Sequence, residues 1–218
     1  MSLYGEYANL EILRYYDDGI TVEKCGSPAG GFEAFDMIYM GAGTEKASMK
    51  ALELLMPYKK ELKNYVENGG IMLLTGSAGE IFGGKIEDNG KENDGLGVFG
   101  YSVRRTDKRI LGDAFADDTN GFFGENARTI GFINRCGIYS TAGNLFTVRD
   151  GLGSDLGCGE GFAYGNAAVT SLIGPLLVKN PHICRYYLKK LGCDVPSDMT
   201  VQQKAYGNAV EAMSADRK

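Results

Sequence analysis

The residues best placed to do chemistry follow a short apolar run in the first half of the chain. Ile71–Leu74 comes directly after a Gly-Gly break and predicts a buried strand. After Thr75, the small residues Gly76–Gly79 (GSAG) allow a tight reversal into a helical start at Glu80. Many α/β enzymes present a nucleophile on such a turn. Here the apex is Gly76, which has no side chain that could attack a carbonyl carbon.

A hydrolase built on this turn also needs an imidazole within hydrogen-bond reach of its nucleophile. The chain contains a single histidine, His182, far downstream. It follows Pro181 in the first turn of a predicted helix, where a polar side chain is commonly solvated or close to a helix cap. We therefore do not expect His182 to act as a catalytic base.

Three other side chains are candidates for a substitute nucleophile. Ser77 partly matches a serine-hydrolase turn, but it lies one residue past the apex, and a serine in a tight turn commonly hydrogen-bonds the backbone. Cys136 and Cys158 lie in Gly-rich segments that could approach the edge of a sheet. Without a histidine partner, we expect these thiols to be inert or merely oxidisable. An enzyme that uses one of the three remains the alternative reading.

A second Gly-rich turn, Gly41–Gly43, follows the apolar run Phe35–Met40. It lacks the full spacing of a phosphate-binding loop, so we interpret it as a structural turn or a vestigial oxyanion loop. The five cysteines form no CxxC pair, which suggests neither a metal site nor a disulfide framework. We expect no cofactor and no metal.

Composition narrows the class of protein. A chain of 218 residues is long enough for one sizeable core, and we expect a single domain over residues 1–218. The net charge of −5 and the short basic runs argue against a nucleic-acid partner. No apolar run approaches the ~18 residues of a membrane helix, and the first residues do not resemble a signal peptide. We therefore expect a cytoplasmic protein without a membrane partner.

Apolar spacing predicts four helices and several strands. Helices are expected over Gly5–Asp18, Thr44–Asn68, Pro181–Leu191 and Val201–Met213. Strands are expected over Ile20–Lys24, Phe35–Met40, Ile71–Leu74, Ile110–Phe115, Thr129–Ile133 and Leu145–Val148. We expect Thr44 and Asn180 to cap helices, and Pro57 to kink or restart one. Gly83–Gly97 is polar and Gly-rich, which favours a mobile surface loop.

This order of elements is typical of a right-handed α/β fold. It predicts a mainly parallel sheet flanked by helices, with additional short strands in the C-terminal half that join the same sheet as mixed or antiparallel strands. Ligands bind such sheets at the carboxyl ends of the strands, and the Gly41 and Gly76 turns would both open on that edge.

Five segments together resemble the CobB/CobQ-like class I glutamine amidotransferases, and in particular the small glutaminase subunits that partner a Mur-ligase-like enzyme in peptidoglycan amidation. They are LYGEYANLEIL near the start, FDMIYMGAG, the Gly76 turn, GFIN at Gly131–Asn134, and Glu160–Pro181. The resemblance covers nearly the whole chain and implies a flavodoxin-like class I glutamine amidotransferase fold.

The chain departs from this family at the residues that do its chemistry. In the family the turn reads Cys-Gly-Gly-Tyr-Gln, and a downstream motif reads Tyr-Leu-His-Gly-Pro. Aligning on Gly83 and on Gly174-Pro175 places Gly76 at the cysteine and Ile173 at the histidine. The resemblance implies a ligand pocket formed by Gly41, Gly43, Gly76, Ser77, Asn134, Ile173 and Gly174.

The chain differs from the family at two further places, and the first of them points the same way. Where the family usually has Glu-Asn-His, this chain has Ile133-Asn134-Arg135. The family also usually opens with an extra apolar strand before the LYG motif, and no such run stands between Met1 and Leu3.

The family reaction releases ammonia from glutamine through a thioester, so it requires a thiolate and a proton-shuttling imidazole. With both groups missing, we expect no catalytic residue and a non-catalytic binding or regulatory subunit of an amidating synthetase or ligase. Its expected partners are a Mur-ligase-like or other amide-forming synthetase and glutamine or a related amino acid. The alternative is an active amidotransferase or hydrolase with a non-standard nucleophile, supplying ammonia for peptidoglycan or corrinoid (cobalamin) amidation. A sensor that kept the glutamine pocket is a third possibility.

Overall fold

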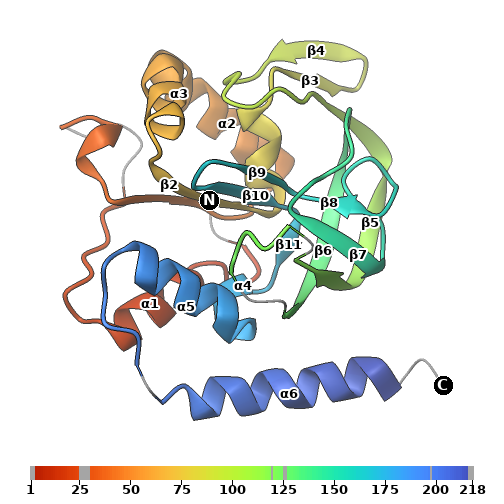
Figure 1. Cartoon of the computed structure of the whole chain (residues 1–218). Coiled ribbons are helices and arrows are strands. Elements are labelled where there is room, and N and C mark those ends of the chain that lie inside the picture. Colours follow the sequence, from red (N-terminus) through yellow and green to blue (C-terminus); the bar gives the residue numbers. More distant parts are fainter. Residues whose placement is uncertain (1–2, 25–29, 119, 125–126, 197, 216–218) are drawn as a thin grey trace.

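The computed structural model describes residues 3–24, 30–118, 120–124, 127–196 and 198–215, and the side chains up to residue 213. A central four-stranded sheet has helices on both faces, and a second sheet lies to one side of it (Figure 1). The central strands, in spatial order, are β1 (Met37–Met40), β2 (Ile71–Thr75), β10 (Ala167–Thr170) and β9 (Phe162–Tyr164). The first three are parallel, and β9 pairs with β10 in the antiparallel sense.

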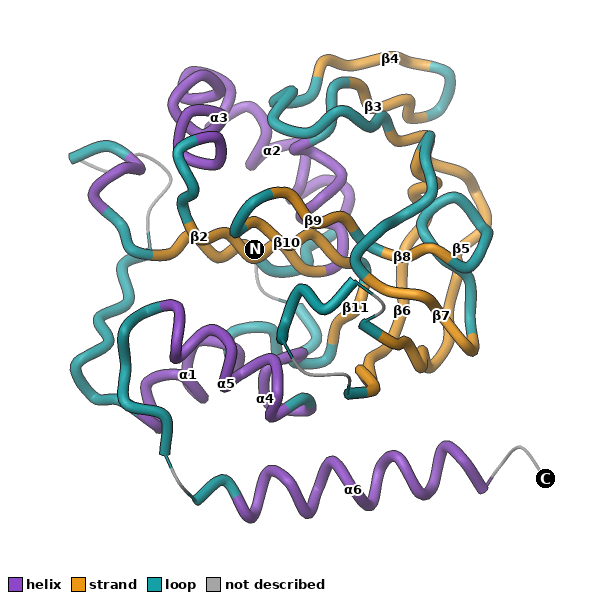
Figure 2. The backbone as a smooth tube through the Cα atoms, viewed as in Figure 1, coloured by secondary structure: helices purple, strands orange, loops and turns teal. Residues whose placement is uncertain are grey.

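The helices form one layer on each face of the central sheet, as Figure 2 shows. On one face lie α1 (Ala8–Tyr16), α4 (Leu176–Lys179) and α5 (Pro181–Lys190), and on the other α2 (Glu45–Leu55) and α3 (Lys59–Glu67). Successive residues of a strand point to opposite faces. Accordingly, Leu73 packs in the core of the first layer, whereas Met72 and Leu74 pack in the core of the second.

Local sequence explains how the second helical layer is built. The hydroxyl of Thr44 accepts a hydrogen bond from the Ala47 N–H at 3.1 Å, which confirms it as the N-cap of α2. Pro57 lies in a 3₁₀ turn, Met56–Tyr58, after which α3 begins at Lys59. Pro57 therefore restarts the helix, because a proline lacks the N–H that a continuous helix would need.

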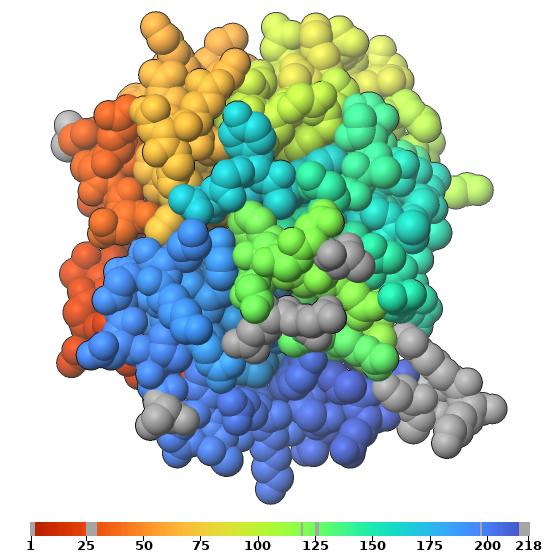
Figure 3. All heavy atoms as spheres, viewed as in Figure 1, coloured from red at the N-terminus to blue at the C-terminus, as the bar shows by residue number. Residues whose placement is uncertain are grey.

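The last helix, α6 (Thr200–Ala215), crosses the outer side of α4 and α5. It is anchored by Gln202, whose amide donates to the carbonyl oxygens of Leu177 and Val178, and by Tyr206, whose hydroxyl donates to the Arg128 carbonyl. In Figure 3, α5 and the green segment near residue 122 lie side by side, where the rings of Phe122 and Tyr186 are 5.5 Å apart.

The second sheet contains seven strands. They are β3 (Lys85–Asp88), β4 (Lys91–Asp94), β5 (Val103–Asp117), β6 (Arg128–Tyr139), β7 (Phe146–Asp150), β8 (Gly159–Glu160) and β11 (Leu172–Ile173). The predicted fold class is confirmed, including extra strands in the C-terminal half. We had expected those strands to extend the first sheet, but they form a separate and mostly antiparallel one around the long β5–β6 pair.

Two predictions of local structure were wrong. Gly83–Gly97 is not a loop throughout, because it contains the β3–β4 hairpin. Asn89 and Gly90 turn this hairpin with positive φ angles of 51° and 73°, the backbone that a two-residue Asn-Gly turn adopts. Asn180 does not cap α5 with its side chain, whose amide instead bonds the N–H and C=O of Ile130 on β6.

A third prediction was wrong at Ile20–Lys24, which is irregular rather than a strand. Within the described part of the chain, no backbone hydrogen bond pairs this segment with β1 or with another strand. A strand exists only through its pairing, so the alternating pattern of the segment alone cannot produce one.

Candidate functional site

The Gly76 turn retains the backbone of a nucleophile-bearing turn. Gly76 follows β2 at its carboxyl end, opens a 3₁₀ helix over Gly76–Phe82, and has a φ of +59°. A Cβ atom at this position would lie 2.6 Å from the Cβ of Ala42 and 2.7 Å from the Cγ2 of Ile173. Both distances are far below van der Waals contact, so these two side chains close the space into which a residue 76 side chain would project.

Ile173 and Gly76 therefore lie together. Ile173 is in β11, where it pairs with Phe132, and its side chain is buried. The next residue, Gly174, has a φ of +86° and donates its N–H to a carboxylate oxygen of Glu6 at 3.0 Å. Nothing on Ile173 can accept or donate a proton.

Gly43 and Ser77 bind each other through two hydrogen bonds. The Ser77 hydroxyl donates to the Gly43 carbonyl oxygen at 2.8 Å and accepts from the Gly43 N–H at 3.1 Å. The N–H of Gly43, in the turn interpreted above as a structural turn or a vestigial oxyanion loop, is thus bound to Ser77. The single histidine, His182, is buried on α5, where its Nε2 lies 3.2 Å from the Thr129 hydroxyl and its ring contacts Tyr206. It is not a partner of Ser77.

A buried polar cluster beneath the turn was missed by sequence reasoning. Glu6 is fully buried, and its carboxylate accepts hydrogen bonds from the hydroxyls of Tyr39 and Thr75 and from the Gly174 N–H. Burial and the neighbouring Glu6 raise the pKa of Tyr39, so its hydroxyl stays protonated. A Cβ at Gly41 would lie 2.9 Å from both Glu6 Cβ and the Tyr39 hydroxyl, so the cluster requires a glycine there.

Asn134 belongs to a polar rim. Its amide oxygen accepts from Arg109 at 2.8 Å, and its amide nitrogen donates to the Tyr4 hydroxyl at 2.6 Å. Arg109 also pairs with Glu45 at the start of α2. None of the described hydrogen bonds joins Asn134 to the Gly76 turn.

The rim borders a pocket of about 280 Å³. Its walls are Glu45, Asp88, Asn89, Arg105, Thr106, Asp107, Arg109 and Cys136. Arg105 is buried and holds three groups at once, Glu80 at 2.8 Å, Asp88 at 3.0 Å and the Ser48 hydroxyl at 2.7 Å. This pocket was not predicted, because its residues are scattered over α2, the β3–β4 hairpin and β5–β6, and only tertiary pairing brings them together.

Comparison with known proteins decides the family. Residues 1–177 match the model of the CobB/CobQ-like glutamine amidotransferase domain. The chain belongs to that family. Within it, the chain is 33% identical over 178 residues to the lipid II isoglutaminyl synthase (glutamine-hydrolyzing) subunit GatD of Staphylococcus aureus, a match that covers 79% of this chain and 66% of that subunit.

Two further similarities agree with this. The GatD subunit of Streptococcus pneumoniae is 26% identical over 226 residues, which cover 89% of this chain and 80% of that subunit. A crystal structure of a glutamine amidotransferase superposes with a TM-score of 0.59 at 18% identity, covering 86% of this chain and 95% of the other. That likeness shows the fold. The family match and the two GatD relatives confirm the predicted resemblance.

Arg135, where the family usually has a histidine, has a structural role in this member of the CobB/CobQ-like family. Its guanidinium is buried and donates to the carbonyl oxygens of Gly137, Gly153 and Ser154, the last at 3.0 Å. It thereby fastens the Gly-rich segment 151–159 against β6. This role is structural and does not require Arg135 to take part in a reaction.

The alternative thiol nucleophiles lack an activating partner among the described contacts. Cys136 donates to Glu45 at 3.4 Å, and burial together with the nearby Glu80 and Glu45 raises the pKa of its thiol to about 12. It is therefore a thiol at neutral pH and not the thiolate that attacks carbonyl carbon. Cys158 lies exposed before β8.

No helix in the described ranges is both long and apolar enough to span a membrane.

Proposed function

We propose that this chain is a glutamine amidotransferase-type subunit that no longer hydrolyses glutamine and that acts as a binding or regulatory subunit of an amide-forming ligase. The observation that carries the proposal is the contact between the Gly76 turn and Ile173. A glutaminase of this family needs a thiol at the first position and an imidazole at the second, facing each other. Here a hydrogen and a hydrocarbon side chain face each other instead, and Ala42 fills the remaining space.

The substitute nucleophiles do not favour the active alternative. Ser77 has its proton engaged by the Gly43 carbonyl oxygen, and the only imidazole of the chain contacts Thr129 and Tyr206. The raised pKa of Cys136 works against nucleophilic attack by that thiol. An amidotransferase supplying ammonia for corrinoid amidation has no observation in its favour beyond the family itself.

The test is ammonia release from glutamine by the purified protein, with a family member that carries the cysteine and histidine as the positive control. We expect no release above the buffer blank. Release that survives alkylation of all five cysteines would point to Ser77, and release abolished by alkylation would point to a thiol. Either result would overturn the proposal.

The relatives named above are subunits of lipid II isoglutaminyl synthase, and this supports a ligase of peptidoglycan precursors as the partner of the chain. We expect the purified chain to retain a Mur-ligase-like protein in a pull-down from the cells that produce it. Recovery of a corrinoid-amidating synthetase instead would move the function to cobalamin biosynthesis. Recovery of no amide-forming enzyme would contradict the subunit role.

The polar pocket favours one additional role, the binding of glutamine or a related amino acid. Its walls carry carboxylates and guanidinium groups, which complement an amino acid with both an ammonium and a carboxylate group. A ligand that binds only the folded protein raises its melting temperature. We expect glutamine to raise the melting temperature of the unmodified protein. The rise should be the same in Arg104→Ala, which alters an exposed residue outside the pocket, and smaller in Arg109→Ala, which alters a pocket wall. Equal shifts in all three would exclude this site.

A further inference from the structure

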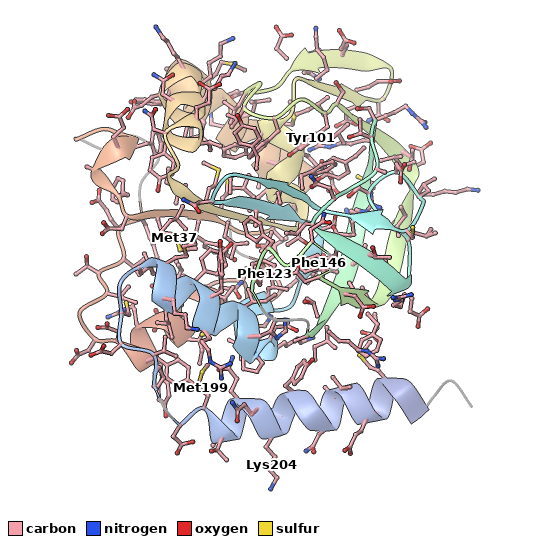
Figure 4. All side chains as sticks on the ribbon, viewed as in Figure 1. Met37, Tyr101, Phe123, Phe146, Met199 and Lys204 are labelled. Carbon is pink, nitrogen blue, oxygen red and sulfur yellow. The ribbon has the colours of Figure 1, made fainter. Side chains whose placement is uncertain are left out.

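The tip of the β3–β4 hairpin forms part of the wall of the polar pocket. Asn89 and Gly90 make its two-residue turn, and both are exposed. Asn89 lines the pocket together with the preceding residue, Asp88. Figure 4 shows the hairpin at the periphery of the molecule, beyond the buried Tyr101, with side chains that project outward from it. The turn is therefore in contact with both the solvent and the pocket.

An asparagine that is followed by a glycine can modify itself in water. The main-chain nitrogen of the glycine attacks the side-chain carbonyl carbon, Cγ, and closes a succinimide ring. The Cγ–Nδ2 bond breaks, and the side-chain nitrogen leaves as ammonia with the proton of the glycine N–H. Water then opens the ring at either of its carbonyl carbons, which gives aspartate or isoaspartate. Glycine favours the first step because it has no Cβ atom to obstruct the approach.

The three Asn-Gly pairs of the chain differ in their contacts. They are Asn68-Gly69, Asn89-Gly90 and Asn120-Gly121. In the first pair the attacking nitrogen is engaged, because Gly69 donates its N–H to the Val66 carbonyl oxygen at 3.1 Å. In the third pair the leaving group is engaged, because the side-chain amide of Asn120 donates to the Asn144 carbonyl oxygen. Each of these two pairs must break a hydrogen bond before the ring can close.

The Asn89-Gly90 pair has neither restraint. The described hydrogen bonds include none from the Gly90 N–H, and a Cβ atom built at Gly90 would meet no atom within 4 Å. The Asn89 amide donates to the carboxylate of Asp88 at 3.0 Å, which is a solvent-exposed bond to an adjacent residue. The contacts therefore predict that Asn89 reacts before Asn68 and Asn120.

Conversion of Asn89 would change how the hairpin is held. Asp88 bonds Arg105 at 3.0 Å, which connects the hairpin to the buried Glu80–Arg105 pair. An aspartate at position 89 would put a second negative oxygen where an N–H now faces Asp88, and like charges at that distance repel. Isoaspartate would disturb the turn further. Its main chain runs through the former side chain and lengthens a turn in which both residues need positive φ angles.

We propose that Asn89 is a site of spontaneous deamidation, and that its conversion loosens the hairpin from Arg105 and opens this wall of the polar pocket. The reaction consumes one water and releases one ammonia, so it needs no other reactant. Its effect on a ligand rests on the proposed amino acid site. There, an amino acid would bind the converted protein less tightly, and a bound amino acid that holds the wall closed would slow the conversion.

The first experiment incubates the full chain in buffer and follows all three Asn-Gly pairs by mass spectrometry of proteolytic peptides. We expect Asn89 to convert roughly five- to tenfold faster than Asn68 and Asn120, because each of those must first break a hydrogen bond. Asn89→Gly is the unreactive control, since Gly-Gly forms the same type of turn. Faster conversion at Asn68 or Asn120, or no conversion at Asn89, would refute the proposal.

Hydrogen exchange tests the effect on the pocket wall. We expect incubated protein to exchange faster over Lys85–Asp94 than fresh protein, and incubated Asn89→Gly to show no such change. Asn89→Asp isolates the effect of the charge, because Asp-Gly also suits this turn, and it should speed exchange in the same segment. Asn208→Asp adds the same charge at an exposed position of α6 and should leave the hairpin unchanged. Unaltered exchange after conversion of Asn89 would overturn the proposal.

Melting temperatures with glutamine separate this proposal from the amino acid site on which its last step rests. We expect glutamine to raise the melting temperature of Asn208→Asp more than that of Asn89→Asp. An equal rise in both variants would contradict the link between Asn89 and the pocket and would leave the amino acid site intact. No rise in either variant or in the unmodified protein would remove the amino acid site, and the conversion and exchange measurements would still decide the proposal.

Discussion

The Cγ2 methyl of Ile173 lies 2.7 Å from the place where a Cβ atom of residue 76 would be, although Gly76 follows a strand of the central sheet and Ile173 is in the second sheet. The resemblance described above assigns the family's nucleophile and base to these two positions, and here the two positions are joined by a packing contact. This contact has consequences for stability that can be measured.

Gly76→Ala is expected to destabilise the protein more than Gly192→Ala does. Both glycines have left-handed backbones, with φ values of +59° and +75°, and an alanine at such a backbone costs about 1–2 kcal/mol. A Cβ at Gly192 meets no atom within 4 Å, whereas one at Gly76 collides with Ala42 and Ile173, which adds about 1–3 kcal/mol of overpacking. Urea unfolding measures the difference.

The same pair has an internal check. Adding Ala42→Gly to Gly76→Ala removes one of the two colliding atoms, so part of the lost stability should return. Equal losses of unfolding free energy in Gly76→Ala and Gly192→Ala would show that Ala42 and Ile173 move aside freely. The space beside Gly76 would then be able to accept a side chain.

Ser77→Ala is expected to cost about 1–3 kcal/mol, because it leaves the N–H and the C=O of Gly43 without their hydrogen-bond partner. Ser140→Ala serves as the control, since Ser140 accepts a single backbone bond from Ser102 at an exposed site and should cost less. Thermal unfolding compares the two. A measurable glutaminase activity that disappears in Ser77→Ala, with stability unchanged, would assign a catalytic role to the hydroxyl instead.

Arg105→Leu should be strongly destabilising, by about 3–5 kcal/mol, because it leaves the buried carboxylate of Glu80 without its cation. Lys85→Leu provides the contrast. Lys85 pairs with Glu92 and Asp94 at 2.9 Å, but at the exposed β3–β4 hairpin, where ion pairs contribute little. If the two substitutions had similar effects in urea unfolding, the Glu80–Arg105 pair would not be the organising contact beneath the polar pocket.

The free energy of unfolding should fall as the pH rises above about 9. Burial raises the pKa of the thiols of Cys136 and Cys184 from 9.0 to about 12. Between these values the unfolded chain releases protons that the folded chain retains, so alkaline solution favours unfolding. The stabilisation is complete below pH 9 and is lost as the pH approaches 12.

Urea titrations between pH 8 and 10.5 measure this slope. Cys184→Ala removes one of the contributing thiols and should make the decline shallower, whatever it costs at neutral pH. Cys158→Ala alters an exposed thiol and should leave the slope unchanged. A decline that is equally steep in all three proteins would assign it to other groups.

The sequence predicted the parts of this protein that local patterns determine. Thr44 and Pro57 act through their own backbone neighbours, so the two-helix layer was correctly predicted. The juxtaposition of Gly76 and Ile173 was also predicted, although only through resemblance to the family. No local pattern reveals that two such distant residues meet.

Other features escaped prediction because they depend on partners remote in sequence. Glu6 looks like a solvent-facing residue of a helical start until Tyr39, Thr75 and Gly174 enclose it. Segment 20–24 has the residue pattern of a strand, but it pairs with no strand in the described part of the chain. The polar composition of Gly83–Gly97 masked the Asn-Gly turn that forms a hairpin there.

The bonds from Glu6 to Gly174 and from Asn9 to Leu177 each span 168 positions of the chain. During synthesis, Glu6 and Asn9 must therefore wait for residues 174–177 before they find these partners. Contacts of such long range form late and slowly. A nascent chain arrested before residue 174 would hold the Glu6 carboxylate in water, and α1 would stay accessible to chaperones and proteases until residues 174–177 have been synthesised.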